Sequence, residues 1–129
     1  MEPRGLIFDC DGTLVDSMSL HWRAWDTVCK RHGIEFSEKR HYAMGGIPSR
    51  KILAILKEEQ GLDFDPLQVS HEKEEAYLPL MSQVRLIEPV VEIARAHRDR
   101  IPMAVATGGR TQFIRPLLDR LEIADWFSA

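Results

Sequence analysis

One short segment near the N-terminus limits what this chain can fold into more than any other. Gly5-Leu6-Ile7-Phe8 is a continuous apolar run, and Asp9-Cys10-Asp11-Gly12-Thr13 follows it directly. Apolar runs of this kind are typical of strands that are buried on both faces of a parallel sheet. Ligands of open α/β sheets bind beyond the carboxyl ends of the strands. The segment therefore predicts an α/β fold with a polar site after its first strand.

A long helical stretch separates this strand from the next one. Apolar residues recur at helical spacing, and Gly33, Gly45-Gly46 and Gly61 divide the pattern into short helices. Pro79 is expected to disturb the last of them, because proline lacks the amide hydrogen that a helix needs. We therefore expect an all-helical insertion over residues 17–83.

The residues after the insertion return to an α/β pattern. Glu88-Pro89 opens a helix whose inward face is expected at Val90, Ile93 and Ala94. A second strand is predicted over 101–106. The order strand, helix, strand implies a parallel sheet with right-handed crossovers.

The last part of the chain predicts one more helix and the start of a strand. Pro116 interrupts a strong apolar stripe, so that helix should start late or kink there. Trp126-Phe127 is interpreted as the beginning of a third strand. The predicted organisation is an incomplete Rossmann-like parallel sheet in segments 1–16 and 84–129, with the helical insertion between them.

The two carboxylates after the first strand have the chemistry of phosphoryl transfer. Asp9 can attack phosphorus, and Asp11 can protonate the leaving oxygen and then deprotonate water. Gly12 lets the chain turn, so that both side chains can serve one site. Mg²⁺ prefers oxygen ligands and offsets the repulsion between two anions. An ordinary polar turn is the alternative, but this five-residue pattern arises by chance in about one chain in 10³.

The run from Asp9 to Ser17, Asp-Cys-Asp-Gly-Thr-Leu-Val-Asp-Ser, resembles the first signature of the haloacid dehalogenase-like superfamily. The resemblance implies that Asp9 is the nucleophile and a metal ligand. It implies that Asp11 is the acid/base and a metal ligand through its backbone carbonyl, with Mg²⁺ as the cofactor. Thr107 resembles the second signature, which binds the transferred phosphoryl group, and Gly108 and Gly12 are the expected neighbours of that phosphate.

The insertion resembles the helical cap of β-phosphoglucomutase and of fructose-1-phosphate phosphatase-like enzymes. His21 and Lys73 match positions that assist cap closure in the mutase. Arg50, or the neighbouring Lys51, matches a cap cation that grips a second phosphate. The alternatives are a solvated histidine at position 21 and, at position 73, an ordinary member of a charged helix face.

Two later signatures of the superfamily do not occur in this sequence. The family has a lysine after the second-strand helix, yet the last lysine here is Lys73. The acidic pair that completes the metal site is also missing, so the resemblance spans about the first two thirds of such an enzyme. A truncated chain, a partial gene and a split protein are the open explanations. An unpaired apolar edge on the first strand would favour self-association.

Composition and charge limit the functional classes to which this protein can belong. The formal net charge is -3 over 129 residues, which gives no electrostatic case for a nucleic-acid partner. No apolar run reaches membrane-spanning length, and we expect a cytoplasmic protein with Cys10 and Cys29 as reduced thiols. The favoured function is a Mg²⁺-dependent phosphatase or mutase acting on a small phosphorylated metabolite such as a sugar phosphate. A catalytically incomplete fragment that binds phosphate or a partner chain is the main alternative, and a receiver domain ranks lower.

Overall fold

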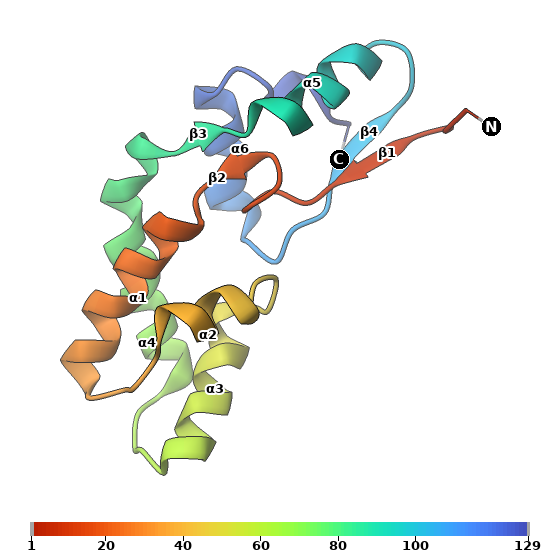
Figure 1. Cartoon of the computed structure of the whole chain (residues 1–129). Helices are drawn as coiled ribbons and strands as arrows, with labels where there is room; N and C mark the ends of the chain where they lie inside the picture. Colours follow the sequence, from red (N-terminus) through yellow and green to blue (C-terminus); the bar gives the residue numbers. More distant parts are fainter. Residues whose placement is uncertain (1, 129) are drawn as a thin grey trace. The chain divides into compact units, whose positions relative to one another are not determined.

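The computed structural model describes residues 2–128 and divides the chain into two compact units (Figure 1). The core unit consists of Met1–Ser17 and Val84–Ala129, and the helical unit consists of Met18–Gln83. Each unit has its own buried residues and is described by itself. None of the described helices is long and apolar enough to span a membrane.

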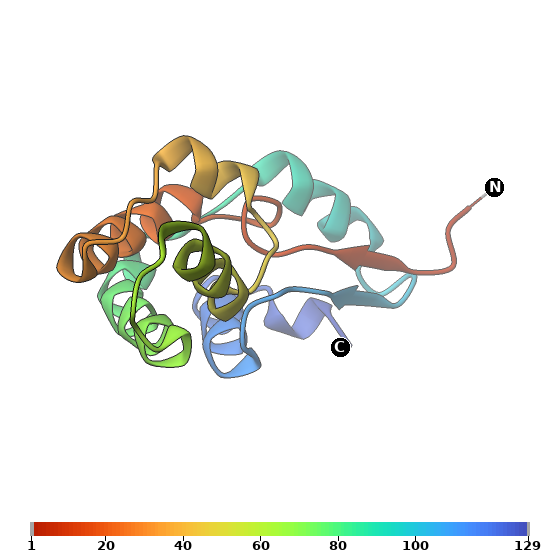
Figure 2. The same ribbon diagram turned by 90° about the horizontal axis from the view of Figure 1, so that it is seen from below.

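Two parallel strands form the centre of the core unit. β1 pairs with β4 so that Leu6 lies beside Met103 and Phe8 beside Val105. The helices α5 and α6 lie on opposite sides of these two strands (Figure 2). The elements of the unit are β1 (Leu6–Phe8), β2 (Val15–Asp16), β3 (Arg85–Leu86), α5 (Glu88–His97), β4 (Met103–Val105), α6 (Thr111–Arg120) and the short 3-10 helix η2 (Ala124–Trp126).

A second, antiparallel strand pair lies where the two segments of the core unit meet. Val15 of β2 pairs with Leu86 of β3, and the amide of Ile87 donates to the carbonyl oxygen of Leu14 at 2.8 Å. This pair was not predicted, because strands of two residues are too short to show an alternating pattern in the sequence.

Three details of the core unit differ from expectation. Trp126, where a third strand was predicted to begin, instead ends the 3-10 helix η2, whereas Phe127 after it is extended and the amide of Ser128 donates to the carbonyl oxygen of Met103 on β4 at 2.8 Å. Helix α6 starts at Thr111, ahead of Pro116, and contains the proline. Val91 and Ala94 are the buried face of α5, whereas Ile93 is 51% exposed.

The helical unit closes a core of its own. Helix α4 packs against both α1 and α3. Its elements are α1 (Met18–His32), α2 (Glu38–Ala43), α3 (Ser49–Gln60), α4 (Pro66–Tyr77) and the 3-10 helix η1 (Leu78–Gln83). The buried cluster consists of Trp25, Val28, Cys29, Ile34, Phe36, Ile52, Leu53, Leu56 and Val69.

Local signals determine where these helices begin and end. The Ser37 side chain accepts a hydrogen bond from the Arg40 amide at the start of α2, and Asp65 caps α4 in the same way through Leu67. Gly61 ends α3 in the left-handed conformation, with a φ of 60°. α4 stops at Tyr77, and the chain continues through Pro79 as a 3-10 helix, as the proline predicts.

Candidate active site

The two polar motifs, Asp9-Cys10-Asp11-Gly12-Thr13 and Thr107-Gly108-Gly109, follow the parallel strand pair at the same end. Phe8 and Val105 are partners at the ends of β1 and β4, and the amide of Ala106 donates to the carbonyl oxygen of Phe8 at 2.8 Å. Asp9 follows Phe8 directly, and Thr107 follows Ala106. The two polar segments therefore begin side by side at the carboxyl ends of neighbouring parallel strands, where ligands of such sheets bind.

The segment after β1 folds into a tight turn around one carbonyl group. The carbonyl oxygen of Cys10 accepts hydrogen bonds from the amides of Thr13, Leu14 and Val15, at 3.1, 2.9 and 3.1 Å. Gly12 has a φ of 78°, a left-handed conformation that residues with a side chain rarely adopt. This turn takes Asp11 off the path of the strand, so the opposite facing of alternate strand residues no longer applies to it.

The two carboxylates have different surroundings. Asp9 is exposed, and its Oδ1 accepts a hydrogen bond from the Cys10 amide at 2.9 Å. Asp11 is half-buried, and its Oδ1 accepts a hydrogen bond from the hydroxyl of Ser17. Ser17 is fully buried. A solvent-open carboxylate suits a group that meets substrate, whereas a carboxylate held by a buried hydroxyl keeps a defined orientation.

Ser17 is a site residue that sequence reasoning missed. It lies in the signature, but only the fold reveals that its hydroxyl reaches back across the turn to Asp11. The available signal was a hydroxyl residue just beyond the short strand β2, and serine is too common at such positions to stand out.

Cys10, between the two carboxylates, is a packed neutral thiol. Burial, and then the neighbouring charges of Asp11 and Asp9, raise the pKa of Cys10 to about 12. The thiolate is the reactive form of cysteine, so this neutral side chain is a poor nucleophile. The Cys10 side chain is fully buried, so its role is in packing.

Thr107 shapes the loop between β4 and α6. Its Oγ1 accepts a hydrogen bond from the Gly109 amide at 3.1 Å, and Thr107 itself is half-buried. Gly108 is exposed between them. A side chain at position 109 would bring its Cβ within 2.9 Å of the Ile114 side chain, so glycine allows the loop to lie close to α6.

His21 and Lys73 meet inside the helical unit. The Nζ atom of Lys73 lies 2.7 Å from Nδ1 of His21, and Lys73 is only 5% exposed. An ammonium group can only donate, so Nδ1 accepts and the imidazole proton sits on Nε2. The alternative that Lys73 belongs to the charged helix face is therefore wrong, although Glu72 and Glu74 flank it in sequence.

Two aromatic rings support this histidine–lysine pair. The ring of Tyr77 stacks on His21 with centroids 3.9 Å apart and an angle of 11° between the planes. Lys73 Nζ lies 5.2 Å from the centroid of Tyr77 and 5.3 Å from that of Trp25. Cation–π contacts of this kind partly replace the water that a buried ammonium gives up. Sequence spacing pointed to Lys73 and His21, but not to the rings beneath them.

Arg50 is exposed in the first turn of α3, and so is Lys51. The structure thus groups the predicted residues by unit. Asp9, Asp11, Gly12, Thr107 and Gly108 follow the two parallel strands of the core unit, whereas His21, Lys73 and Arg50 belong to the helical unit. Whether the second group serves the first stays a prediction.

Comparison with known proteins decides the family. The model of the haloacid dehalogenase-like hydrolases matches residues 3–129. The chain belongs to this family. It is 34% identical over 127 residues to an uncharacterized protein of Haemophilus influenzae, and 32% identical over 125 residues to fructose-1-phosphate phosphatase YqaB of Escherichia coli. Each alignment covers 97% of this chain, but the chain spans only 63% and 66% of the two relatives.

Solved structures confirm the fold of this haloacid dehalogenase-like chain. A hydrolase from Pseudomonas syringae matches with a TM-score of 0.81 at 24% identity, covering 93% of this chain and 57% of that protein. β-Phosphoglucomutase from Clostridium difficile matches with a TM-score of 0.85 at 19% identity, covering 98% and 60%. The predicted family and the predicted α/β fold with helical segments are both confirmed.

The candidate site of this haloacid dehalogenase-like chain contains oxygen atoms, which are the ligand type that Mg²⁺ prefers. Mg²⁺ is commonly held by one or two carboxylates, with waters and substrate phosphates filling its remaining positions. Asp9 and the backbone carbonyl of Asp11 are the oxygen donors that the resemblance predicts for the ion. Across residues 2–128, no three Asp, Glu, His or Cys side chains gather as a ready-made metal cluster. The chain thus offers a small oxygen donor set of the right chemical type.

Proposed function

We propose that this protein is a Mg²⁺-dependent phosphatase of small phosphorylated metabolites, with sugar phosphates as the substrate class. The main support is the pairing of β1 with β4, because Asp9 and Thr107 follow partner strands at one end of the sheet. The E. coli relative is a fructose-1-phosphate phosphatase, and a Thermotoga maritima relative, 28% identical, is a phosphorylated carbohydrates phosphatase. A phosphoglucomutase-like reaction is the variant of this proposal in which a second sugar phosphate, not water, accepts the phosphoryl group.

The proposed reaction has two steps. The Asp9 carboxylate attacks phosphorus, the bond between phosphorus and the ester oxygen breaks, and Asp11 gives its proton to the leaving alcohol. In the second step Asp11 takes a proton from water, which attacks the same phosphorus and breaks its bond to Asp9. Inorganic phosphate leaves and Asp9 is regenerated. Bound Mg²⁺ would neutralise negative charge between Asp9 and the phosphate.

Other residues of the core unit would position the phosphoryl group. The hydroxyl of Thr107 and the amides near Gly108 and Gly12 are donors of the kind that phosphate oxygens accept. Ser17 would hold the Asp11 carboxyl in one orientation through its hydrogen bond. In the helical unit, Lys73, His21 and Arg50 would contact the rest of the substrate and contribute mainly to closure and specificity.

Replacing Asp9 tests the proposal most directly. The test uses a full-length form of the protein, as long as its relatives. In it, Asp9→Asn should lower sugar-phosphate turnover by at least about 10⁴-fold, because an amide is no nucleophile. The aspartyl-phosphate should no longer be trapped. Asp63→Asn is the matched control, since Asp63 is an exposed carboxylate between α3 and α4, outside the signature. Phosphate release near the wild-type rate in Asp9→Asn would rule out Asp9 as the nucleophile.

A second function, binding of another chain at the sheet edge, has one specific observation in its favour. Ile7 lies in the middle of β1 yet is 76% exposed. The amide of Leu6 and the carbonyl of Phe8 bond toward β4, and successive residues of a parallel strand alternate, so the polar backbone groups of Ile7 point to the other edge.

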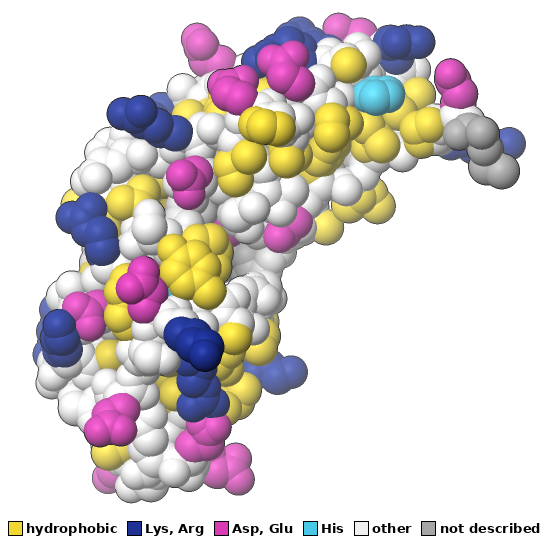
Figure 3. Space-filling model, viewed as in Figure 1, with side chains coloured by type: hydrophobic (Ala, Val, Ile, Leu, Met, Phe, Trp, Pro, Cys, Tyr) yellow, Lys and Arg dark blue, Asp and Glu magenta, His cyan; other side chains and the backbone are white. Residues whose placement is uncertain are grey.

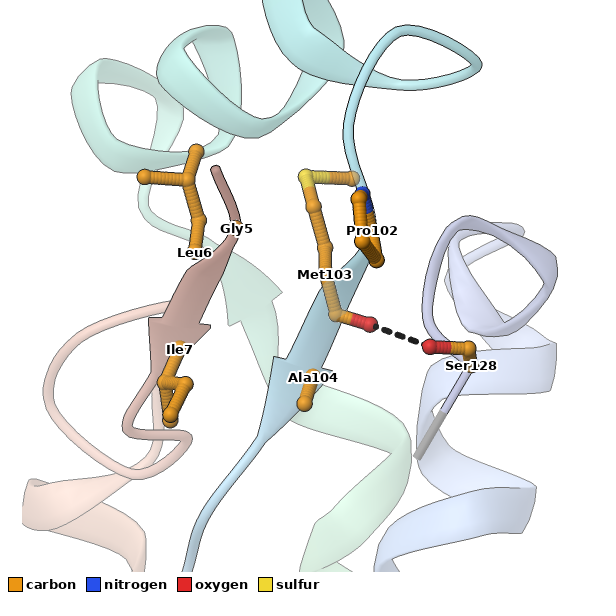
Figure 4. Close-up of a pocket in the computed structure, with 7 residues that line it drawn as sticks. All are labelled: Gly5, Leu6, Ile7, Pro102, Met103, Ala104 and Ser128. Carbon is orange, nitrogen blue, oxygen red and sulfur yellow. Dashed lines mark hydrogen bonds between the residues drawn. The ribbon is translucent and has the colours of Figure 1, made fainter. Parts of the chain in front are cut away.

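An apolar hollow adjoins this strand pair (Figure 4). Its volume is about 320 Å³, and the Ser128 hydroxyl at its border donates to the carbonyl oxygen of Met103 at 3.2 Å. The lining residues are Gly5, Leu6, Ile7, Pro102, Met103, Ala104 and Ser128. Hydrophobic side chains also gather over α5 and the neighbouring strands (Figure 3). An apolar strand edge of this kind favours pairing with a further strand.

A further inference from the structure

His41 is a buried histidine that the proposed reaction does not use. It lies in the last turn of α2 and is 5% exposed. Its Nε2 atom lies 3.0 Å from the carbonyl oxygen of Met18, the first residue of α1. The imidazole therefore connects α2, which has only six residues, to the first turn of a neighbouring helix.

Only the neutral imidazole suits this position well. A carbonyl oxygen accepts, so Nε2 carries the proton and Nδ1 of the neutral ring does not. The surroundings are aromatic, because the centroids of Trp22 and Phe36 lie 5.9 and 6.2 Å from that of His41. A second proton would place a positive charge on a ring that is only 5% exposed, and burying a charge is costly.

We propose that His41 is a pH-sensitive latch that holds α2 on the first turn of α1 and releases it as the pH falls through the imidazole range. The latch goes beyond the proposed phosphatase reaction and does not depend on it. In the closed state α2 packs on α1 with His41 buried, and in the open state α2 is detached and His41 lies in water. A proton on the ring destabilises the closed state, so the open state becomes more populated.

The charges that face His41 act in both directions. Burial is the largest cause and lowers the pKa of His41 below its ordinary value of 6.5. Lys73 of α4 lowers the pKa further, whereas the bond to Met18 and the carboxylate of Glu38 on α2 raise it. A lowered pKa means that the open state binds the proton more readily, so the latch is stable above about pH 6.5 and weakens below it.

His41 and Met18 lie close in sequence to residues that the proposed reaction uses. Met18 directly follows Ser17, whose hydroxyl holds Asp11 in the core unit. On the other side, α2 leads into the loop of Gly45 and Gly46 and then to Arg50 in the first turn of α3. Release of α2 would therefore loosen the segment that precedes Arg50.

Hydrogen exchange of the full chain tests the latch. From about pH 7.5 to about pH 5.5, the opening equilibrium of the α2 amides, corrected for intrinsic exchange and compared with α3, should rise by up to roughly tenfold. His41→Gln keeps an N–H donor but does not titrate, so this rise should disappear. His71→Gln, which changes an exposed histidine on α4, should retain it.

A second measurement keeps the test decisive if the glutamine variant folds poorly. The imidazole signals of His41 in the wild-type chain, followed by NMR, should titrate below the ordinary value of 6.5. His41→Phe preserves the aromatic packing and should also remove the pH dependence of α2. Titration of His41 at or above that value, or equal protection of α2 at both pH values in the wild type, would overturn the latch.

Discussion

The two units of this protein differ in where their exposed apolar residues lie: Leu67 and Leu78 of the helical unit lie at the two ends of α4, whereas Ile7 of the core unit lies in the middle of β1. In the helical unit, Val28, Leu53 and Leu56 are fully buried within a cluster that this unit supplies alone. In the core unit, Ile7 is 76% exposed at the centre of β1 and Ile93 is 51% exposed on α5. An apolar run that is typical of a strand buried on both faces is therefore only partly covered.

The helical unit buries its apolar core with its own helices, whereas a parallel strand such as β1 needs further strands and helices to be fully buried. Helices packed in a small bundle bury their apolar stripes against one another over a local stretch of chain. A central parallel strand needs partners on both edges and helices on both faces, and these come from distant parts of a sequence. The relatives are longer than this chain, which spans 63% and 66% of the first two.

The largest expected effect concerns the activity of the 129-residue chain alone. We expect it to hydrolyse a small aryl phosphate at least about 10²–10³-fold more slowly than a form of the protein that carries the later lysine and acidic ligands of the family, because the loss of one charge-stabilising donor alone costs about that much. Parallel assays with Mg²⁺ measure the ratio. Equal turnover by both forms would mean that the core unit needs no further residues.

The 129-residue chain should self-associate through the free edge of β1, where Ile7 is 76% exposed. Sedimentation or light scattering should give a mass above that of the monomer of 14.8 kDa. Ile7→Lys should shift the mass toward the monomer, since a charge on an edge strand opposes pairing. Lys in place of Leu67, an exposed residue on α4, is the matched control and should change nothing. A monomeric wild-type chain would contradict binding at this edge.

Truncation of one apolar side chain in each unit sharpens the comparison energetically. Leu53→Ala should lower the free energy of unfolding by about 2–5 kcal/mol, because Leu53 is completely buried and its removal leaves a cavity. Ile7→Ala should change it by less than about 0.5 kcal/mol, because most of its side chain is already in water. Urea titrations of both variants, followed by circular dichroism, measure the two values. Similar losses would show that Ile7 is packed in solution.

The smallest expected effect concerns the histidine–lysine pair. In a full-length protein, Lys73→Ala should reduce kcat/KM for a sugar phosphate by about tenfold and affect a small aryl phosphate less, because the lysine would act on the part of the substrate beyond the phosphate. Lys57→Ala is the control, since Lys57 lies on α3, outside this pair. An equal loss for both substrates would assign Lys73 to the stability of the helical unit instead.

Local signals made most of the elements predictable. Gly61 marked the end of a helix in the sequence, and in the structure it ends α3 in the left-handed conformation. The strand before Asp9 and the family signature could also be predicted from the sequence. The predicted third strand began too early at Trp126, because an aromatic residue suits a 3-10 turn as well as a strand, and the chain becomes extended only at Phe127.

The sequence by itself determined the family, the α/β fold and the identity of the residues proposed for phosphoryl transfer, because these are encoded in short contiguous motifs such as Asp9 to Ser17. Only the tertiary structure decided that Ser17 reaches Asp11, that Lys73 is buried against His21 and that His41 joins Met18. These contacts join residues that are distant in sequence or separated by a turn. The burial that distinguishes Lys73 from its charged neighbours depends on how α1 packs on α4, and no periodicity in either helix specifies that partner.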